Sequence, residues 1–209
     1  DVAYYNGRYY VYFGVVPCLL FQLPFEALTG IQNLAYAPCM VVLGLLLLAA
    51  CFGVVGQAVR RWFPQTSAAA YLLAVAAVVL GSQLYYLLVR PYIYEYAILC
   101  GAALLMLGLW LWLSAASTPV EKRGAILAKL AFGSLFAALV AGCRPQMELF
   151  AFLAVPIFWQ RYIGQKRLCS RAGAGEAAAF ILPVVVVAAG LMWYNAARFG
   201  SPLDFGANY

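Results

Sequence analysis

Residues 35–61 read AYAPCMVVLGLLLLAACFGVVGQAVRR, and this stretch decides the fold class. No charged side chain occurs in it before Arg60, and Arg61 follows directly. A helix that crosses a bilayer needs about 20 mostly apolar residues, because each residue adds only about 1.5 Å to its length. Residues 35–59 are therefore predicted to form a transmembrane helix that ends in two arginines at one membrane surface.

The composition of the whole chain agrees with this class. Hydrophobic residues make up 67% of the 209 residues and charged residues only 10%, whereas soluble domains have roughly 45–50% and roughly 25%. A water-soluble fold of this length could not bury so much apolar surface, so we expect a lipid bilayer to surround the chain. The net charge is +6, but the basic residues form no continuous stripe, and the sequence does not favour nucleic-acid binding.

Five further runs repeat the pattern of an apolar stretch followed by polar or basic residues. We therefore predict one all-α transmembrane domain over residues 1–209, a polytopic helical bundle of about six spans. The spans are expected at residues 35–59, 68–89, 96–116, 125–142, 147–160 and 177–197. The fifth run has only about 14 residues, and it is expected to tilt or to borrow residues from its flanks.

Residues 1–33 are expected to form an outer loop and a surface segment, ahead of the six spans and short loops of residues 34–209. Residues 9–28 are apolar, but Pro17 and Pro24 interrupt them. Proline removes a backbone donor and clashes with the preceding helical turn, so we predict a re-entrant or interfacial segment here rather than a span. The chain begins and ends without a polar tail, which we interpret as an excerpt of a longer protein.

Alternating spans sort the charged residues onto two sides of the membrane. One side receives nine basic residues, Arg60, Arg61, Lys122, Arg123, Lys129, Arg161, Lys166, Arg167 and Arg171. The other receives four arginines and four carboxylates, Arg8, Arg90, Arg144, Arg198, Asp1, Glu95, Glu148 and Asp204. Because basic loops stay in the cytoplasm, the first side is predicted to be cytoplasmic. Each outer charge could be an anchor that snorkels to water, but the set favours a polar pocket on the outer face.

Four motifs carry the outer charges. The first is DVAYYNGRYYVYFG at residues 1–14, where Asn6 and Gly7 predict a β-hairpin because both turn positions favour positive φ. The hairpin could lie at the headgroups as part of an aromatic belt. It could also form a platform on which a sugar stacks, with Asp1 at its edge.

The second motif is RPYIYEY at residues 90–96. Glu95 stands just before an apolar helix, where the helix dipole favours negative charge, so it could be a simple capping carboxylate. It could instead be a general base or a hydroxyl-binding group next to Tyr94, with Arg90 holding an anion nearby.

The third and fourth motifs lie at two more outer turns. In GCRPQME, Arg144 and Glu148 could pair with each other. In residues 193–209, two glycines, a proline and Asp204 are expected to end a helix and to begin an ordered outer loop.

Several kinds of chemistry lack sequence support. No Walker loop, GxSxG, GxGxxG or HExxH motif occurs, which argues against nucleotide-driven transport and hydrolase chemistry. The chain has no histidine and no CxxC pair, so a structural zinc or redox site is not expected.

The four motifs also resemble those of a known family. YYNGRYYVYFG, RPYIYEYAI, AGCRPQ and YNAARFGSPLDFGANY are similar to landmarks of bacterial multi-pass glycosyltransferases of the GT-C type. These enzymes are relatives of the protein O-mannosyltransferases and the lipid A aminoarabinose transferases. The resemblance covers essentially the whole chain, and it implies a GT-C-like fold in the bacterial plasma membrane.

The resemblance implies roles for the outer residues. Asp1 would be the acid of the first outer loop, residues 9–28 its interfacial helices, and Glu95 a second acid. The outer arginines would hold the phosphate of a polyprenyl-phosphate sugar, and a divalent cation bound by carboxylates could assist. The candidate catalytic residues are Asp1 and Glu95, and the candidate substrate-binding residues are Arg8, Arg90, Tyr94, Arg144, Glu148, Arg198 and Asp204.

Two other functions remain open. A transporter or flippase for lipid-linked sugars needs charged or helix-breaking positions near mid-membrane. The predicted span interiors lack acids, and Pro156 and Pro183 are their main interruptions, which favours an enzyme at the rim. A non-catalytic subunit of a membrane assembly is the other alternative.

Overall fold

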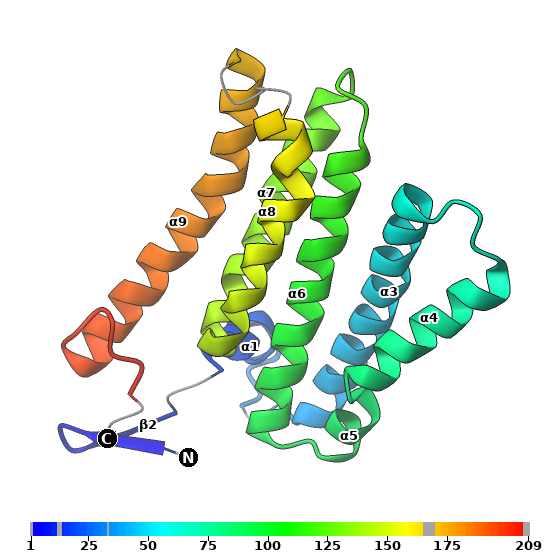
Figure 1. Ribbon diagram of the computed structural model, residues 1–209. Coiled ribbons are helices and arrows are strands. Elements are labelled where there is room, and N and C mark those ends of the chain that lie inside the picture. The colour runs from blue at the N-terminus through cyan, green and yellow to red at the C-terminus, as the bar shows by residue number, and fades with distance from the viewer. Residues whose placement is uncertain (1, 12–13, 33, 165–169, 207–209) are drawn as a thin grey trace.

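The computed structural model describes residues 2–11, 14–32, 34–164 and 170–206. Within these ranges the protein is a bundle of helices with a β-hairpin at one end (Figure 1). The elements are β1 (Val2–Tyr5), β2 (Arg8–Val11), α1 (Val15–Pro17), the π-helix η1 (Cys18–Gln22), α2 (Leu23–Thr29), α3 (Tyr36–Trp62), α4 (Ala68–Gly81), α5 (Leu84–Val89), α6 (Ile93–Ser117), α7 (Arg123–Leu139), the 3₁₀-helices η2 (Val140–Gly142) and η3 (Pro145–Leu153), α8 (Ala154–Phe158), the π-helix η4 (Trp159–Gly164) and α9 (Arg171–Phe199).

Four helices are long and apolar enough to cross a membrane. They are α3, α6, α7 extended by η2, and α9, with 27, 25, 20 and 29 residues. The first, third, fourth and sixth predicted spans thus correspond to long apolar helices, as expected. Two of these helices begin before the expected spans, α6 at Ile93 instead of residue 96 and α9 at Arg171 instead of residue 177. Ser170 explains the early start of α9, since its side chain accepts a hydrogen bond from the amide of Gly173 and caps the helix.

The second predicted span, residues 68–89, is not one continuous helix. It divides into the 14-residue α4 and the 6-residue α5, because the chain breaks at Gln83, whose φ of 54° is left-handed. The two pieces lead back toward the start of α3, with α4 inclined to the axis of α3 (Figure 1). At the start of α4, the Tyr71 hydroxyl donates to the carbonyl of Phe52 over 3.0 Å, and Leu84 of α5 packs against Gly44 of α3.

The fifth predicted span, residues 147–160, mixes helix types. It lies within η3, α8 and η4, which run alongside α6 from Met147 at Gly101 to Arg161 at Ala115. A 3₁₀-helix rises about 2.0 Å per residue, against about 1.5 Å in an α-helix. The nine residues of η3 therefore extend about 18 Å instead of about 14 Å, which lengthens a run that is short in residues. By length neither this run nor α4 qualifies as a span, so six spans are not established.

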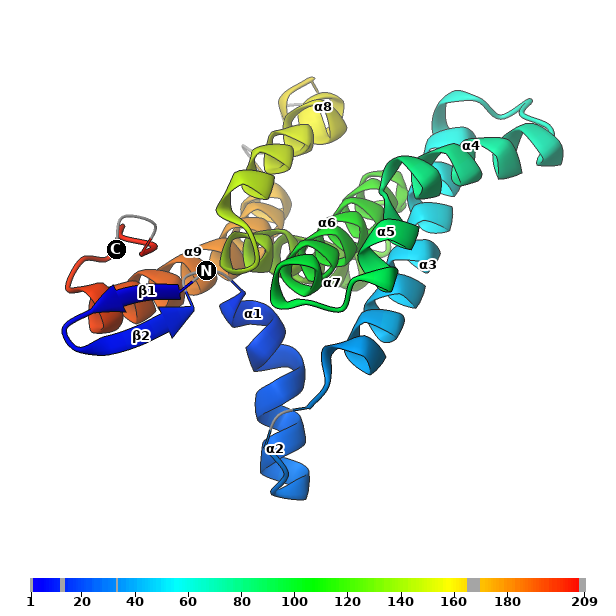
Figure 2. The same cartoon turned by 90° about the horizontal axis from the view of Figure 1, so that it is seen from below.

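The proline-containing segment forms a short helical run rather than a span. Val15–Thr29 is apolar but has fewer than 18 residues, and it projects sideways from the bundle (Figure 2). The Tyr96 hydroxyl of α6 holds it, with the carbonyl oxygen of Pro17 and Oε1 of Gln22 each 3.0 Å away.

The predicted hairpin is confirmed. β1 and β2 pair antiparallel, with Tyr5 opposite Arg8, and Asn6 and Gly7 form the turn with φ of 48° and 78°. Positive φ at both positions is what a two-residue hairpin turn requires.

The buried core centres on α6, which packs between α3 and α7. Trp112 of α6 is 2% exposed, and its Nε1 donates to the Ser134 hydroxyl of α7 over 3.2 Å. Gly108 of α6 and Gly133 of α7 face each other, so that the two backbones approach closely.

Candidate functional site

The predicted outer residues gather at one end of the bundle. This end, called the hairpin end below, consists of residues 2–11, 90–92, 143–145 and 200–206 (Figure 1). The opposite end, called the basic end, consists of residues 63–67, 118–122 and the start of α9. Lys166 and Arg167, like Asp1, lie outside the described residues. The separation of the described charges agrees with the predicted sorting, and the cytoplasmic assignment of the basic end stays a prediction.

Arg90 and Glu95 form an ion pair across the turn between α5 and α6. Arg90 Nε lies 3.6 Å from Glu95 Oε1, and Arg90 Nη1 also donates to the hydroxyl of Tyr86, over whose ring the guanidinium lies at 5.3 Å. Glu95 sits in the first turn of α6, where the helix dipole favours a carboxylate. The Arg90 side chain is 49% exposed and that of Glu95 only 13%, so the pair presents its arginine to the surroundings.

Arg144 joins the turn after α7 to the start of α6. Its guanidinium carbon lies 4.5 Å from the centre of the Tyr94 ring, a cation–π contact. Tyr94 directly precedes Glu95, so this contact brings the Arg144 turn to the element that carries the Arg90–Glu95 pair. Glu148 stands in the first turn of η3, half-buried, and within the described part of the chain its Oε2 has no hydrogen-bond partner.

Arg198 is surrounded by aromatic rings at the end of α9. Its guanidinium carbon lies 5.1 Å from the ring centre of Tyr10 and 4.6 Å from that of Tyr194. The neighbouring Phe199 meets Tyr5 and Tyr10 edge to face, with ring centres 5.9 and 5.6 Å apart. The aromatic hairpin therefore docks on α9 through the rings around Arg198.

A small cleft connects the Arg198 cluster with the Arg144 turn. Gly142 and Pro145 line it from one side, and Tyr194, Asn195 and Arg198 from the other. Arg144 thus contacts Tyr94, next to the Arg90–Glu95 pair, and the neighbouring Pro145 lines the cleft that Arg198 also lines.

The remaining predicted site residues are placed differently. Arg8 is exposed beside the hairpin turn. Asp204 closes a local turn, in which its Oδ1 accepts a hydrogen bond of 2.8 Å from the amide of Gly206. Asp1, the candidate acid of the first outer loop, lies outside the described residues.

The described residues do not fit a metal centre. Among them, no group of three or more His, Cys, Asp or Glu side chains could hold an ion. Glu95 is paired with Arg90 and Asp204 with its own turn. The divalent cation suggested by the resemblance therefore has no set of ligands in the described part of the chain.

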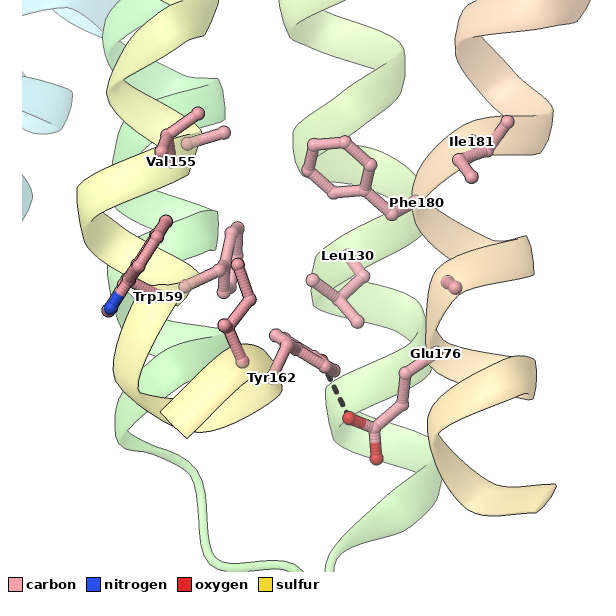
Figure 3. Close-up of a pocket in the computed structure, with 11 residues that line it drawn as sticks. Leu130, Val155, Trp159, Tyr162, Glu176, Phe180 and Ile181 are labelled. Carbon is pink, nitrogen blue, oxygen red and sulfur yellow. Dashed lines mark hydrogen bonds between the residues drawn. The ribbon is translucent and has the colours of Figure 1, made fainter. Parts of the chain in front are cut away.

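A buried acid near the basic end was missed at the sequence level. Glu176 is 0% exposed, although the span interiors were expected to lack acids. Its Oε2 accepts a hydrogen bond of 2.6 Å from Tyr162 (Figure 3). The same oxygen lies 3.8 Å from Arg161 Nε. Because α9 begins at Arg171 and not at residue 177, Glu176 is inside this apolar helix. Ser170, a good N-cap ahead of an alanine-rich run, was the signal for the earlier start.

An apolar pocket of about 310 Å³ lies beside this acid, between α7, α9 and the run of α8 and η4 (Figure 3). Leu130, Phe158 and Phe180 line it, and Glu176 with Tyr162 forms its polar edge. The other lining residues are aliphatic or aromatic.

A scan against protein-family models and searches of curated proteins and of solved structures found no match. The observations establish a predominantly helical protein with four long apolar helices that could span a membrane.

Proposed function

We propose that the protein is an integral membrane glycosyltransferase, which moves a sugar from a polyprenyl-phosphate donor to an acceptor at the hairpin end. In this proposal the hairpin end faces away from the cytoplasm, and the membrane is the bacterial plasma membrane. The described residues of the four sequence motifs that resemble GT-C enzymes lie at this end. The fold between them, with about six passes, belongs to the same proposal.

One observation carries the proposal. Arg90, Arg144 and Arg198 come from three different turns, and each lies over a tyrosine ring at the same end of the bundle. Stacking on a ring fixes the plane of a guanidinium, whose N–H groups match the oxygens of a phosphate. Fixed arginines at the boundary of an apolar bundle suit a ligand that has a phosphate head and a hydrocarbon tail.

The proposed chemistry follows from these positions. The acceptor hydroxyl oxygen attacks the anomeric carbon of the sugar, and the bond from that carbon to the phosphate oxygen breaks. The bonding electrons pass to the phosphate, where Arg90 and Arg144 stabilise the added charge. The acceptor proton passes to a carboxylate, for which Glu95 is the described candidate. Attack opposite the leaving phosphate inverts the configuration at that carbon.

Binding of a polyprenyl phosphate to the purified protein tests this function. We expect the double variant Arg90→Gln/Arg144→Gln to bind at least about tenfold more weakly, because each charge-assisted hydrogen bond contributes about 1.5–3 kcal/mol. Arg171→Gln is the matched control, since it removes a charge at the basic end. Arg198 stays unchanged because its ring contacts hold the hairpin. Equal binding by all three proteins contradicts the proposal.

A transfer assay separates the proposed enzyme from its alternatives. Glu95→Gln should lose transfer while it keeps lipid binding, because the amide cannot accept a proton but has nearly the same shape. Binding without any transfer in the wild-type protein favours a flippase or an assembly subunit. Glu176 does not strengthen the flippase alternative, because it lies only about 7.5 Å along α9 from its start at Arg171 and contacts Arg161 and Tyr162.

A further inference from the structure

A second cavity opens at the basic end, where α3 and α6 end and α7 begins. Its volume is about 820 Å³. The described residues that line it are Gln57, Arg60, Arg61, Ser114, Ala116, Ser117, Thr118, Pro119, Lys122, Ala125 and Lys129. The proposed transfer chemistry at the hairpin end makes no use of this cavity.

The cavity concentrates positive charge. Arg60, Arg61, Lys122 and Lys129 line it, and none of the described lining residues is an acid. Glu121 belongs to the adjacent loop, but it is exposed and does not line the cavity. Four cations around one space repel one another unless an anion lies between them.

Polar groups in the wall supply further donors. Ser114, Ser117 and Thr118 line the cavity, and Lys129 Nζ donates to the Thr118 hydroxyl over 2.9 Å, which holds the ammonium at the wall. Arg61 Nη1 is buried, and no hydrogen-bond partner for it occurs among the described residues. Its guanidinium lies over the Trp62 ring at 5.2 Å, which fixes its position.

The helix ends favour an anion here and not a cation. Arg60 and Arg61 stand in the last turn of α3, where basic side chains are favourable. Lys122, in contrast, is the N-cap of α7, whose first turn contains no acid. The N-terminus of a helix repels cations and binds phosphates through its unpaired amides. A lysine at that position is unfavourable by itself and becomes favourable when an anion is bound.

The position of the cavity indicates where such an anion comes from. Trp62 and Phe63, at the end of α3 beside the cavity, are 52% and 64% exposed. Exposed aromatic side chains at the end of a membrane helix are typical of headgroup depth. Basic pockets between helices at that depth bind anionic lipid headgroups.

We propose that this cavity binds the phosphate group of an anionic ligand, and that the source is the headgroup of an anionic phospholipid in the surrounding leaflet. Arg60 and Lys122 contact the phosphate in this arrangement, Arg61 and Lys129 complete its surroundings, and the hydroxyl groups of the wall bind its oxygens. A free phosphate compound would satisfy the same groups, so the test has an arm for each source.

The test measures binding of short-chain phosphatidylglycerol to the full protein, purified in neutral detergent, by titration calorimetry. The variant Arg60→Gln/Lys122→Gln should bind at least about tenfold more weakly, because both side chains contact the phosphate in the proposed site and each such contact with anionic lipid contributes about 1 kcal/mol. The matched control is Arg123→Gln/Arg171→Gln, which removes two charges from the same end but none from the cavity wall. The control should stay within about twofold of wild type.

Each further outcome decides one part of the proposal. Equal weakening in both double variants overturns it, because the attraction would then be general to the basic end. Binding of phosphatidylcholine as tightly as phosphatidylglycerol also overturns it. Tight binding of inorganic pyrophosphate without binding of the lipid supports the phosphate site but overturns its lipid source. If the double variant does not fold, Lys122→Gln carries the test, because Lys122 is exposed and its loss should weaken binding about fivefold.

Discussion

Arg161 joins three elements through one guanidinium group. Its Nη1 donates to the carbonyls of Ala115 and Thr118 at the end of α6, over 3.1 and 3.0 Å, and its Nε lies 3.8 Å from Glu176 of α9. The side chain belongs to η4, and the residue is only 9% exposed. A cation near the last carbonyls of a helix satisfies groups that have no partner within the helix. Arg161 therefore stabilises the end of α6 and the packing of α9 together.

Replacement of Glu176 should destabilise the folded protein. Glu176→Gln preserves the shape of the side chain but leaves Arg161 buried without its counter-charge. Breaking a buried ion pair in this way costs about 3–5 kcal/mol, and the 3.8 Å separation favours the lower end of that range. Thermal unfolding in detergent should show a clear drop in midpoint temperature.

Glu121→Gln is the control for this prediction. Glu121 is an exposed acid in the loop after α6, at the same end of the bundle. Its replacement should change the free energy of unfolding by less than about 0.5 kcal/mol. Equal midpoints for both variants would show that Glu176 contributes nothing beyond its volume.

Residue-level features could be predicted where their cause is local. The hairpin turn needs only Asn6 and Gly7, and the sequence shows both. The environment of Glu176 depends on Tyr162, 14 positions away, and on Arg161, which the charge sorting placed among the cytoplasmic basic residues. No local sequence pattern predicts that Glu176 contacts Arg161 and Tyr162, because these contacts form only when α9 packs against η4.

At the level of elements, α6 and α7 touch where both have glycine. A Cβ added to Gly108 would lie 2.9 Å from the carbonyl oxygen of Gly133, and one added to Gly133 would lie 2.7 Å from Trp112. In lipid, helices gain little from the hydrophobic effect and associate through close packing, which small residues permit. These two positions therefore set how closely α6 and α7 approach.

Alanine at Gly108 should loosen this contact. The atom in its way belongs to the backbone of α7 and cannot rotate aside, so we expect a loss of roughly 2 kcal/mol of stability, as for other overpacked cores. Gly190→Ala in α9 is the matched control, because a Cβ there meets nothing within 4 Å. That substitution should be neutral or stabilising by up to about 1 kcal/mol, since alanine favours helix. Unfolding of both variants in the same detergent measures the difference.

The irregular elements explain why two predicted spans, residues 68–89 and 147–160, differ from the helices in the structure. Hydropathy is continuous over residues 68–89, so it cannot reveal the left-handed turn at Gln83 that separates α4 from α5. It also cannot reveal the 3₁₀ geometry of η3, which lengthens a run of few residues. Apolar content is a property of side chains, whereas these features depend on backbone angles set by packing against α3 and α6.

For the whole molecule, the distribution of charged residues predicted which end of the bundle each loop occupies better than the apolar runs did. Loops that the sequence placed on one side lie together at one end of the bundle, even where the run between them is broken or irregular (Figure 1). Sorting the charges onto two sides works even for broken or irregular runs, because it requires only that each run brings the chain to the other end of the bundle. It gives the direction of each segment but not which arginine faces which ring, because those contacts form between turns far apart in the sequence.

Accessible cysteines can determine whether the two irregular runs cross the membrane. Gln65, Glu121, Gln146 and Leu203 are exposed loop or turn positions, and each can carry a single cysteine after the native cysteines are replaced. If residues 68–89 cross, Gln65→Cys and Glu121→Cys must face the same side, and if they do not, these two positions face opposite sides. The pair Gln146→Cys and Leu203→Cys tests residues 145–164 in the same way.

The labelling pattern then decides between six crossings and fewer. With an impermeant maleimide on intact cells, we expect label at positions 146 and 203 and none at 65 and 121 until the membrane is opened. Nine basic residues against four set that orientation, because positive loops stay in the cytoplasm. A split within either pair would remove the corresponding run from the count of crossings. A split between positions 146 and 203 would also place the Arg90 and Arg198 turns on opposite sides of the membrane, and one phosphate site could not then include both. A split between positions 65 and 121 would leave these two turns on the same side, because residues 68–89 precede Arg90.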